Sequence, residues 1–379
     1  MIRVFTPANA TRAIFFVSGF GSATWAPLVP FFKNRLDIGE DVLGFLIVCI
    51  GIGALSSSFF AGSIAARFGC RRVIVASTIL EILALFILSR VDSIPFAILS
   101  LIFFGASAGF LDVTMNLHAV LVEQKSRRQI MSGMHAMWSV GGFIGALAFS
   151  FWLMHGLSSE STTLIEMCVM GILLGIFFRA LYPTGGKSEG KAFAIPRGIV
   201  TFIAIIMLIA FLAEGSIMDW GAVFLTSEKG IPIEQSGMAF AIFSAAMFVM
   251  RVIGDSIVAR LGGKIVVILG CIIELAGFLL VIFSPNIPLM YLGFFAIGFG
   301  SSNVVPVMYS MLGRQKVMPV NLAVASTSMI GYFGMLAGPS SIGFIAKATS
   351  LTSAFILLSI LVFIELLVAR YIYSRENSM

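Results

Sequence analysis

The segment Ser63-Ile-Ala-Ala-Arg-Phe-Gly69 returns 193 residues later as Ser256-Ile-Val-Ala-Arg-Leu-Gly262. The same offset aligns further pairs along the chain: Glu81 with Glu274, Gly105 with Gly298, Gly141 with Gly334 and Gly145 with Gly338. A single offset kept over four apolar segments indicates that one structural unit has been duplicated. The two copies of the short segment each follow an apolar stretch, so they mark equivalent loops.

The composition of the chain points to lipid as its solvent. Hydrophobic residues make up 59% of the 379 residues, charged residues only 11%, and the mean hydropathy is +1.05. Soluble domains carry about 25% charged residues. Such a surplus of apolar surface is stable only inside a membrane.

Apolar stretches of about 20 residues, the length that spans a bilayer, occur twelve times. They lie near 11–32, 42–65, 73–89, 94–119, 131–154, 162–178, 199–226, 237–258, 265–284, 287–311, 321–346 and 352–369. We therefore predict an all-α membrane protein with twelve transmembrane helices in two six-helix pseudo-repeats. Its predicted parts are an N-terminal bundle at 1–182, a cytoplasmic linker at 183–197 and a C-terminal bundle at 198–379.

Basic residues fix the predicted orientation, because Lys and Arg collect on the cytoplasmic side. Of the 24 Lys and Arg residues, 17 fall in segments on the side of the N-terminus, 5 on the opposite side and 2 within spans. This asymmetry predicts a multi-pass protein of the cell inner membrane with both termini in the cytoplasm. The net charge of +6 then reflects the orientation of the chain in the membrane. We therefore expect the lipid bilayer as a partner and do not expect binding to nucleic acid.

The loop Gly62-Ser-Ile-Ala-Ala-Arg67-Phe-Gly69-Cys-Arg71-Arg72 resembles the signature of the major facilitator superfamily, whose members carry this duplicated architecture. The resemblance implies a cytoplasmic gate built by these residues. The acidic position of the signature is Ala66 here and Ala259 in the second copy. A carboxylate stands instead at Asp255, one turn after Arg251, and we predict an intrahelical ion pair between them that serves the gate. The predicted gate residues are Gly62, Arg67, Gly69, Arg71, Arg251 and Asp255.

A narrower resemblance, to the YbjJ-type branch and distantly to fucose/glucose proton symporters, is carried by Gly109-Phe-Leu-Asp112-Val-Thr-Met-Asn116 and by His135-x-x-x-Ser139-x-Gly141-Gly142. Asp112 and Asn116 are spaced i, i+4 and so share a helix face. Asp112 and His135 lie at similar depth on consecutive antiparallel helices. They form either a proton-binding pair or a buried hydrogen-bonded pair that fixes two helices, and both roles can hold at once.

Further polar residues fall inside the apolar spans, where charge is costly. Glu214, Asp219 and Trp220 lie on the seventh span, and the resemblance implies that the first, fourth, seventh and tenth spans line the cavity. We predict a substrate cavity from Trp25, Asn116, Glu214, Asp219, Trp220 and Asn303, and proton coupling through Asp112, His135, Glu214 and Asp219. Each Trp could instead anchor the helix at the membrane interface. Glu81 and Glu274 are assigned a packing role, and Glu166 and Glu365 no function.

These observations predict a secondary active transporter that moves a small polar or amphipathic organic solute by alternating access and needs no cofactor. The carboxyl groups within the spans favour protons over sodium as the coupling ion, although backbone carbonyls can also form sodium sites. No Gly-x-x-x-x-Gly-Lys-Ser/Thr nucleotide loop occurs in the chain, so an ion gradient supplies the energy. The alternatives are a drug or metabolite proton antiporter, a membrane-embedded enzyme and a non-transporting receptor. An enzyme is disfavoured because the three His residues lack metal-ligand spacing. We expect a monomer.

Overall fold

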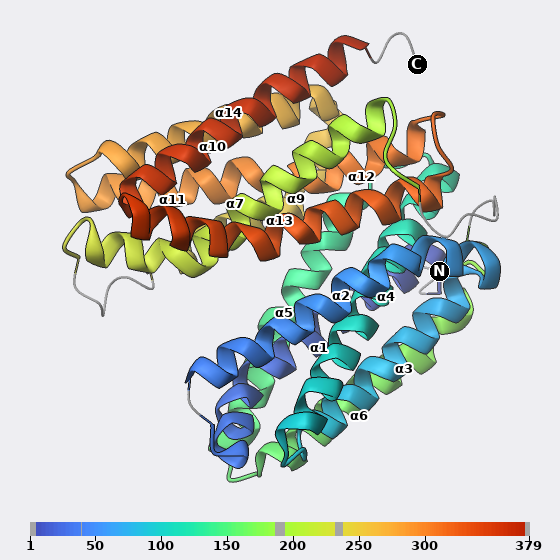
Figure 1. Ribbon diagram of the computed structural model, residues 1–379. Coiled ribbons are helices and arrows are strands. Elements are labelled where there is room, and N and C mark those ends of the chain that lie inside the picture. The colour runs from blue at the N-terminus through green and yellow to red at the C-terminus, as the bar shows by residue number, and fades with distance from the viewer. Residues whose placement is uncertain (1–4, 39, 186–193, 232–237, 376–379) are drawn as a thin grey trace. The chain divides into compact units, whose positions relative to one another are not determined.

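The computed structural model describes residues 5–38, 40–185, 194–231 and 238–375, and every regular element in these ranges is a helix (Figure 1). The first half contains α1 (Pro7–Leu36), α2 (Glu40–Phe68), α3 (Cys70–Leu88), α4 (Ile94–Ser126), α5 (Met131–Met154), α6 (Ser159–Phe177) and the short 3-10 helix η1 (Phe178–Ala180). The second half contains α7 (Ile199–Ser227), α9 (Met238–Leu261), α10 (Gly263–Phe283), α11 (Ile287–Ser301), α12 (Val304–Arg314), α13 (Val320–Ala348) and α14 (Leu351–Arg375).

Each of the twelve predicted spans corresponds to a helix in this order, which confirms the predicted fold class. Ten helical segments in the described ranges are long and apolar enough to cross a membrane. The other two are α1 and α3, and α3 carries Arg71 and Arg72 in its first turn. The prediction of one continuous tenth helix was wrong, because this span is divided into α11 and α12. Residues 186–193 of the predicted linker lie outside the described residues.

The chain forms two compact units. The first unit comprises Met1–Ser126, Met134–Ala194 and Pro319–Ser326, and the second comprises Arg127–Gly133, Ile195–Met318 and Thr327–Met379. Each unit therefore includes a short segment from the other half of the sequence: the start of α13 belongs to the first unit and the start of α5 to the second. The predicted division at 183–197 stays a prediction.

Equivalent positions of the sequence repeat have the same backbone geometry. Gly69 and Gly262 directly precede α3 and α10, with φ of +88° and +80°, a region open essentially only to glycine. A Cβ at Gly105 would overlap the carbonyl of Ile50, and one at Gly298 would overlap the carbonyl of Phe243. Both contacts repeat at the offset of 193 residues, which supports duplication of the structural unit.

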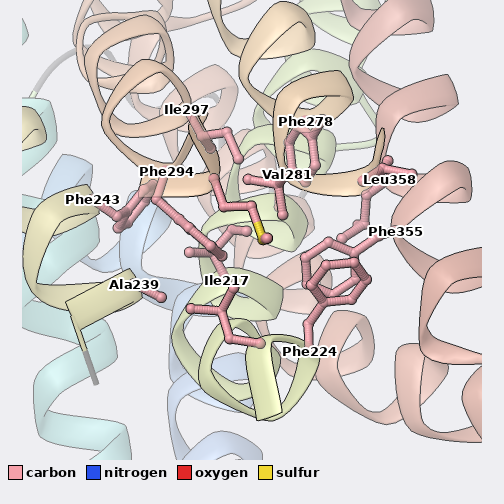
Figure 2. Close-up of a cluster of buried hydrophobic side chains, with 14 of the residues drawn as sticks. Ile217, Phe224, Ala239, Phe243, Phe278, Val281, Phe294, Ile297, Phe355 and Leu358 are labelled. Carbon is pink, nitrogen blue, oxygen red and sulfur yellow. The ribbon is translucent and has the colours of Figure 1, made fainter. Parts of the chain in front are cut away.

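Each unit has its own apolar core. In the first unit, Trp25 packs edge-on against Phe32, with ring centroids 5.3 Å apart, and lies near Phe104. In the second unit, Phe224 of α7 stacks on Phe355 of α14 with ring centroids 4.2 Å apart. Figure 2 shows this cluster, with side chains from α7, α9, α10, α11 and α14 converging. Since lipid is as apolar as leucine, close packing is the main attraction between such helices.

Candidate functional site

The tenth membrane helix is interrupted between Ser301, where α11 ends, and Val304, where α12 begins. Pro306 contributes to this break, because proline has no amide hydrogen and cannot donate to the carbonyl of Ser302 four residues earlier. The Nε of Arg251 on α9 donates to that carbonyl at 3.2 Å. A charged side chain of α9 therefore satisfies a backbone acceptor that the helix leaves open.

Arg251 also forms an ion pair with Glu214 of α7, with Nη2 and Oε2 3.7 Å apart. The side chains are 8% and 24% exposed, respectively. A buried cation needs a counterion, because the desolvation of an unpaired charge costs several kcal/mol. Glu214 lies on α7, whereas Asp255, the partner predicted from the sequence, lies on α9 with Arg251 itself. Through these contacts Arg251 joins α7, α9 and the α11–α12 break.

Asn303 lies at the break itself and is buried. Its Nδ2 donates to the carbonyl of Met250 and to Oγ of Ser302, both at 3.1 Å. Its Oδ1 has no hydrogen-bond partner among the described residues and lies close to the Cα of Gly254, where a Cβ would overlap it. Asn303, which we predicted in the cavity, therefore fastens the break to α9.

The Asp255 carboxylate lies at the start of α5. Its Oδ2 accepts a hydrogen bond from the amide of Gly133 at 3.0 Å, in the first turn of that helix. The first four amides of a helix lack partners within it, and the helix dipole favours a negative charge there. A cavity of about 670 Å³ adjoins Asp255, and Arg127, Arg128 and Arg314 are among its lining residues. Asp255 thus caps the N-terminus of α5 and lies beside a cavity lined by basic residues.

The predicted gate residues of the first unit make three different kinds of contact. The Arg71 guanidinium donates to the carbonyls of Leu181, at 2.5 and 2.8 Å, and of Arg179, at 2.9 Å. The carbonyl of Gly62 accepts from Nδ2 of Asn321 at 3.2 Å. Arg67 lies over the ring of Phe68, its guanidinium carbon 5.3 Å from the centroid. Within the first unit, the chain just before Gly69 therefore contacts the start of α13 at Asn321, and the chain just after Gly69 contacts the segment that follows α6.

The two acid–amide candidates of α4 contact each other. Nδ2 of Asn116 donates to the carbonyl oxygen of Asp112 at 3.0 Å and to its Oδ1 at 3.2 Å. On α5, the His135 ring packs edge-on against Phe15 of α1, with centroids 5.3 Å apart. All four residues belong to the first unit. The pairing of Asp112 with His135 stays a prediction.

The remaining predicted cavity residues have different surroundings. Trp25 is 9% exposed and belongs to the apolar core of the first unit, a place that suits packing more than substrate contact. Trp220 is partly buried against the second core, where its ring edge approaches Gly343. Asp219, its neighbour on α7, is exposed. Among the described residues, no three His, Cys, Asp or Glu side chains gather to hold a metal ion.

Sequence reasoning did not identify the role of His118. The side chain is fully buried, its Nδ1 lies 2.9 Å from Oγ1 of Thr11, and its Nε2 accepts from the amide of Tyr182 at 2.8 Å. An imidazole nitrogen that accepts a hydrogen bond carries no proton. His118 is therefore a neutral connector of α1, α4 and the chain after α6. Its position near the end of an apolar span gave no signal of these partners.

Comparisons with known proteins agree with this architecture. The model of the Major Facilitator Superfamily matches residues 13–213 and 203–378. An uncharacterized MFS-type transporter of Yersinia pestis is 42% identical over 347 residues, covering 91% of this chain and 90% of its own.

Solved structures of low sequence identity share the fold. The E. coli fucose:proton symporter FucP, in the outward conformation, has a TM-score of 0.80 at 14% identity, with 97% and 98% of the two chains covered. The human organic anion transporter MFSD10 has a TM-score of 0.76 at 14% identity, with 96% and 98% covered. The chain therefore belongs to the Major Facilitator Superfamily, and it is a multi-pass membrane transporter and not an enzyme.

Proposed function

We propose that this chain moves a small polar or amphipathic organic solute, such as a sugar-like metabolite, by proton-coupled alternating access. The Glu214–Arg251 ion pair at the α11–α12 break is the observation that carries the proposal. Discontinuous membrane helices form substrate and ion sites in transporters. A carboxylate in such a place can exchange its ion pair for a proton.

Protonation of Glu214 would change the forces at the break. The neutral acid no longer attracts Arg251, which is left with the carbonyl of Ser302. Loss of one partner of a buried pair costs about 3–5 kcal/mol, enough to shift a two-state equilibrium roughly a hundredfold or more. Proton binding on α7 thereby favours a conformation in which α9 and the break are arranged differently.

The solute class follows from the polar groups of the predicted cavity. The carboxylates of Asp112 and Asp219 accept hydrogen bonds from hydroxyl or ammonium groups, and Trp220 offers an apolar face with one donor. Ligand sites combine such apolar surface with a few polar groups. Asp112, His135 and Asp219 remain further candidates for proton coupling.

A pH-sensitive dye enclosed in proteoliposomes tests this function. Sugars, polyols and sugar acids are added outside one at a time, and the change of internal pH is followed. Symport predicts acidification by at least one solute, and Glu214→Gln should abolish it while exchange of that solute across the membrane continues. Solute exchange without any proton movement in the wild-type protein would contradict proton coupling. Glu81→Gln, a buried carboxyl of the first unit, is the matched control and should keep the wild-type response.

An efflux antiporter is the second candidate. Gly334-x-x-x-Gly338-Pro339 is similar to a motif typical of antiporters, although the first copy at Gly141 and Gly145 lacks the proline. The Multidrug resistance protein 2 of Bacillus subtilis is 27% identical over 36% of this chain. The same assay separates the two functions by sign, because an antiporter exports protons as the solute enters and makes the interior alkaline.

For the protein in the cell, we propose a monomer in the inner membrane with both termini cytoplasmic. The asymmetry of 17 basic residues against 5 supports this orientation. Bacterial relatives of similar length support the inner membrane.

A further inference from the structure

Two acidic side chains in the second unit are more deeply buried than Glu214. Glu274 of α10 and Glu365 of α14 are both 0% exposed. None of their four carboxyl oxygens has a hydrogen-bond partner among the described residues. An unpaired charge in such surroundings costs so much free energy that the group instead becomes neutral.

The two carboxyl groups lie on neighbouring helices. α10 and α14 pack against each other, and both carboxyl groups are on buried faces of these helices. Glu274 lies 11 residues after the first residue of α10, and Glu365 lies 10 residues before the last residue of α14. Because the two helices run antiparallel through the bilayer, the side chains lie at matching heights.

Apolar side chains cover this pair along both helices. One turn beyond Glu274 begins the cluster of Figure 2, which contains Phe278 and Val281 of α10 with Phe355 and Leu358 of α14. In the opposite direction lie buried residues of both helices: Val267, Cys271, Ala369 and Ile372. A proton that reaches the pair must therefore come from the side, through another helix.

Glu214 of α7 provides that connection. In the first unit, a Cβ at the equivalent position, Gly21, would lie 2.9 Å from Oε1 of Glu81, so the repeat puts the Glu214 side chain beside Glu274. The Glu214 side chain is 24% exposed. The other ionisable groups that face the three carboxyls are Arg251 of α9, through Glu214, and Cys271 of α10 itself. α11 and α12 meet this part of α10 through Gly300 and Val304, which carry no charge. Glu365, Glu274 and Glu214 thus form a series that ends at Glu214, the one member that is partly exposed.

The first unit shows what the same fold does without this series. Glu81 is equivalent to Glu274 in the repeat and is equally buried, with both oxygens unpartnered among the described residues. The position equivalent to Glu214 is Gly21, whose Cα faces the Glu81 carboxyl. The position equivalent to Glu365 is Ile172, which is exposed. Only the second copy has a carboxyl at all three places.

We propose that Glu274 and Glu365 together store a proton and exchange it with Glu214. In this step the O–H bond of the Glu274 acid breaks and a new O–H bond forms on the Glu214 carboxylate. The negative charge thereby moves from Glu214 on α7 to Glu274 on α10. Glu274 then takes the proton of Glu365, or regains one from Glu214. The use of this store in coupling rests on the proposed function, whereas proton exchange within the series does not.

Infrared spectroscopy of the purified protein tests the exchange without a substrate. The carbonyl stretch of protonated carboxylic acids is followed after transfer to heavy water, which replaces the acid proton by deuterium. Glu274→Gln and Glu365→Gln assign the absorption of the pair by its loss. Glu214→Gln should slow its deuterium exchange about tenfold, which corresponds to a rise of about 1.4 kcal/mol in the activation free energy, because the carboxyl group that passes the proton on is gone.

Glu81 is the internal control for this measurement. Glu81→Gln should remove a separate carboxyl absorption whose deuterium exchange does not depend on Glu214. Unchanged exchange of the pair in Glu214→Gln would overturn the proposal, and so would equal slowing of the Glu81 absorption. If the single variants of the pair fail to fold, Glu274→Asp and Glu365→Asp, which keep the carboxyl group, assign the absorption of the pair by its shift. Absence of solute-driven proton movement in proteoliposomes, with exchange observed, would remove the proposed function and leave the store intact.

Discussion

Replacing Glu214 by Gln removes the charge that faces Arg251 and keeps the size of the side chain. At an effective dielectric constant of about 20, unit charges 3.7 Å apart attract each other by about 4–5 kcal/mol. Desolvation offsets part of this attraction, but the single variant leaves Arg251 buried without a counterion. We therefore expect Glu214→Gln to lower the free energy of unfolding by about 3–5 kcal/mol.

The partner variant should behave differently. Arg251→Gln leaves Glu214 without its partner, but that side chain is partly exposed, so a smaller loss of about 1–3 kcal/mol is expected. The double variant Glu214→Gln, Arg251→Gln leaves no unpaired charge and should lose much less than the sum of the two singles. Reversible unfolding in mixed detergent micelles measures all four free energies.

The Arg90–Glu160 ion pair of the first unit provides the matched control. Its atoms are closer, at 3.3 Å, but its side chains are 39% and 46% exposed. Water screens such a pair, so its double-mutant coupling should be only about 0.2–1 kcal/mol. Additive losses at Glu214 and Arg251, or coupling no larger than that of the exposed pair, would refute the argument from burial.

Three further predictions address topology, the first unit and the repeat. A reporter fused to the C-terminus should be active only in its cytoplasmic form and one inserted after Lys229 only in its external form; an external C-terminus would contradict the twelve-span topology. If Asp112 and His135 are paired, each single variant (Asp112→Asn, His135→Gln) leaves a buried polar group unmet at a cost of about 1–3 kcal/mol. The double variant should then lose less than the sum in transport and melting temperature, whereas additive losses would show independent groups. Gly262→Ala should destabilise the protein by about 1–3 kcal/mol, because φ is +80° there and no atom obstructs a Cβ. Gly171→Ala, in a helix with equally open space, should instead leave the free energy of unfolding unchanged or raise it by up to about 1 kcal/mol, and equal effects of the two changes would remove the backbone explanation.

The sequence by itself determined the number of spans and the duplication. Long apolar stretches can be satisfied only by helices in a bilayer, because lipid offers no hydrogen bonds to the backbone. Gly69 and Gly262 occupy equivalent positions of the repeat, and both adopt a positive φ that favours glycine. Pro306, three residues after Asn303, is the sequence feature that indicates the interruption of the tenth span, because proline cannot donate a backbone hydrogen bond.

The tertiary structure alone decided which polar groups meet. The Glu274 and Glu365 positions are 91 residues apart, and Arg251 and Glu214 are 37 apart, so no local spacing could pair them. In soluble proteins an apolar stripe shows which face of a helix turns inward. Here lipid and protein interior are both apolar, and the rotation of each helix is fixed instead by packing, such as the contact of Gly21 with Glu81. That rotation determines which carboxyl groups face one another.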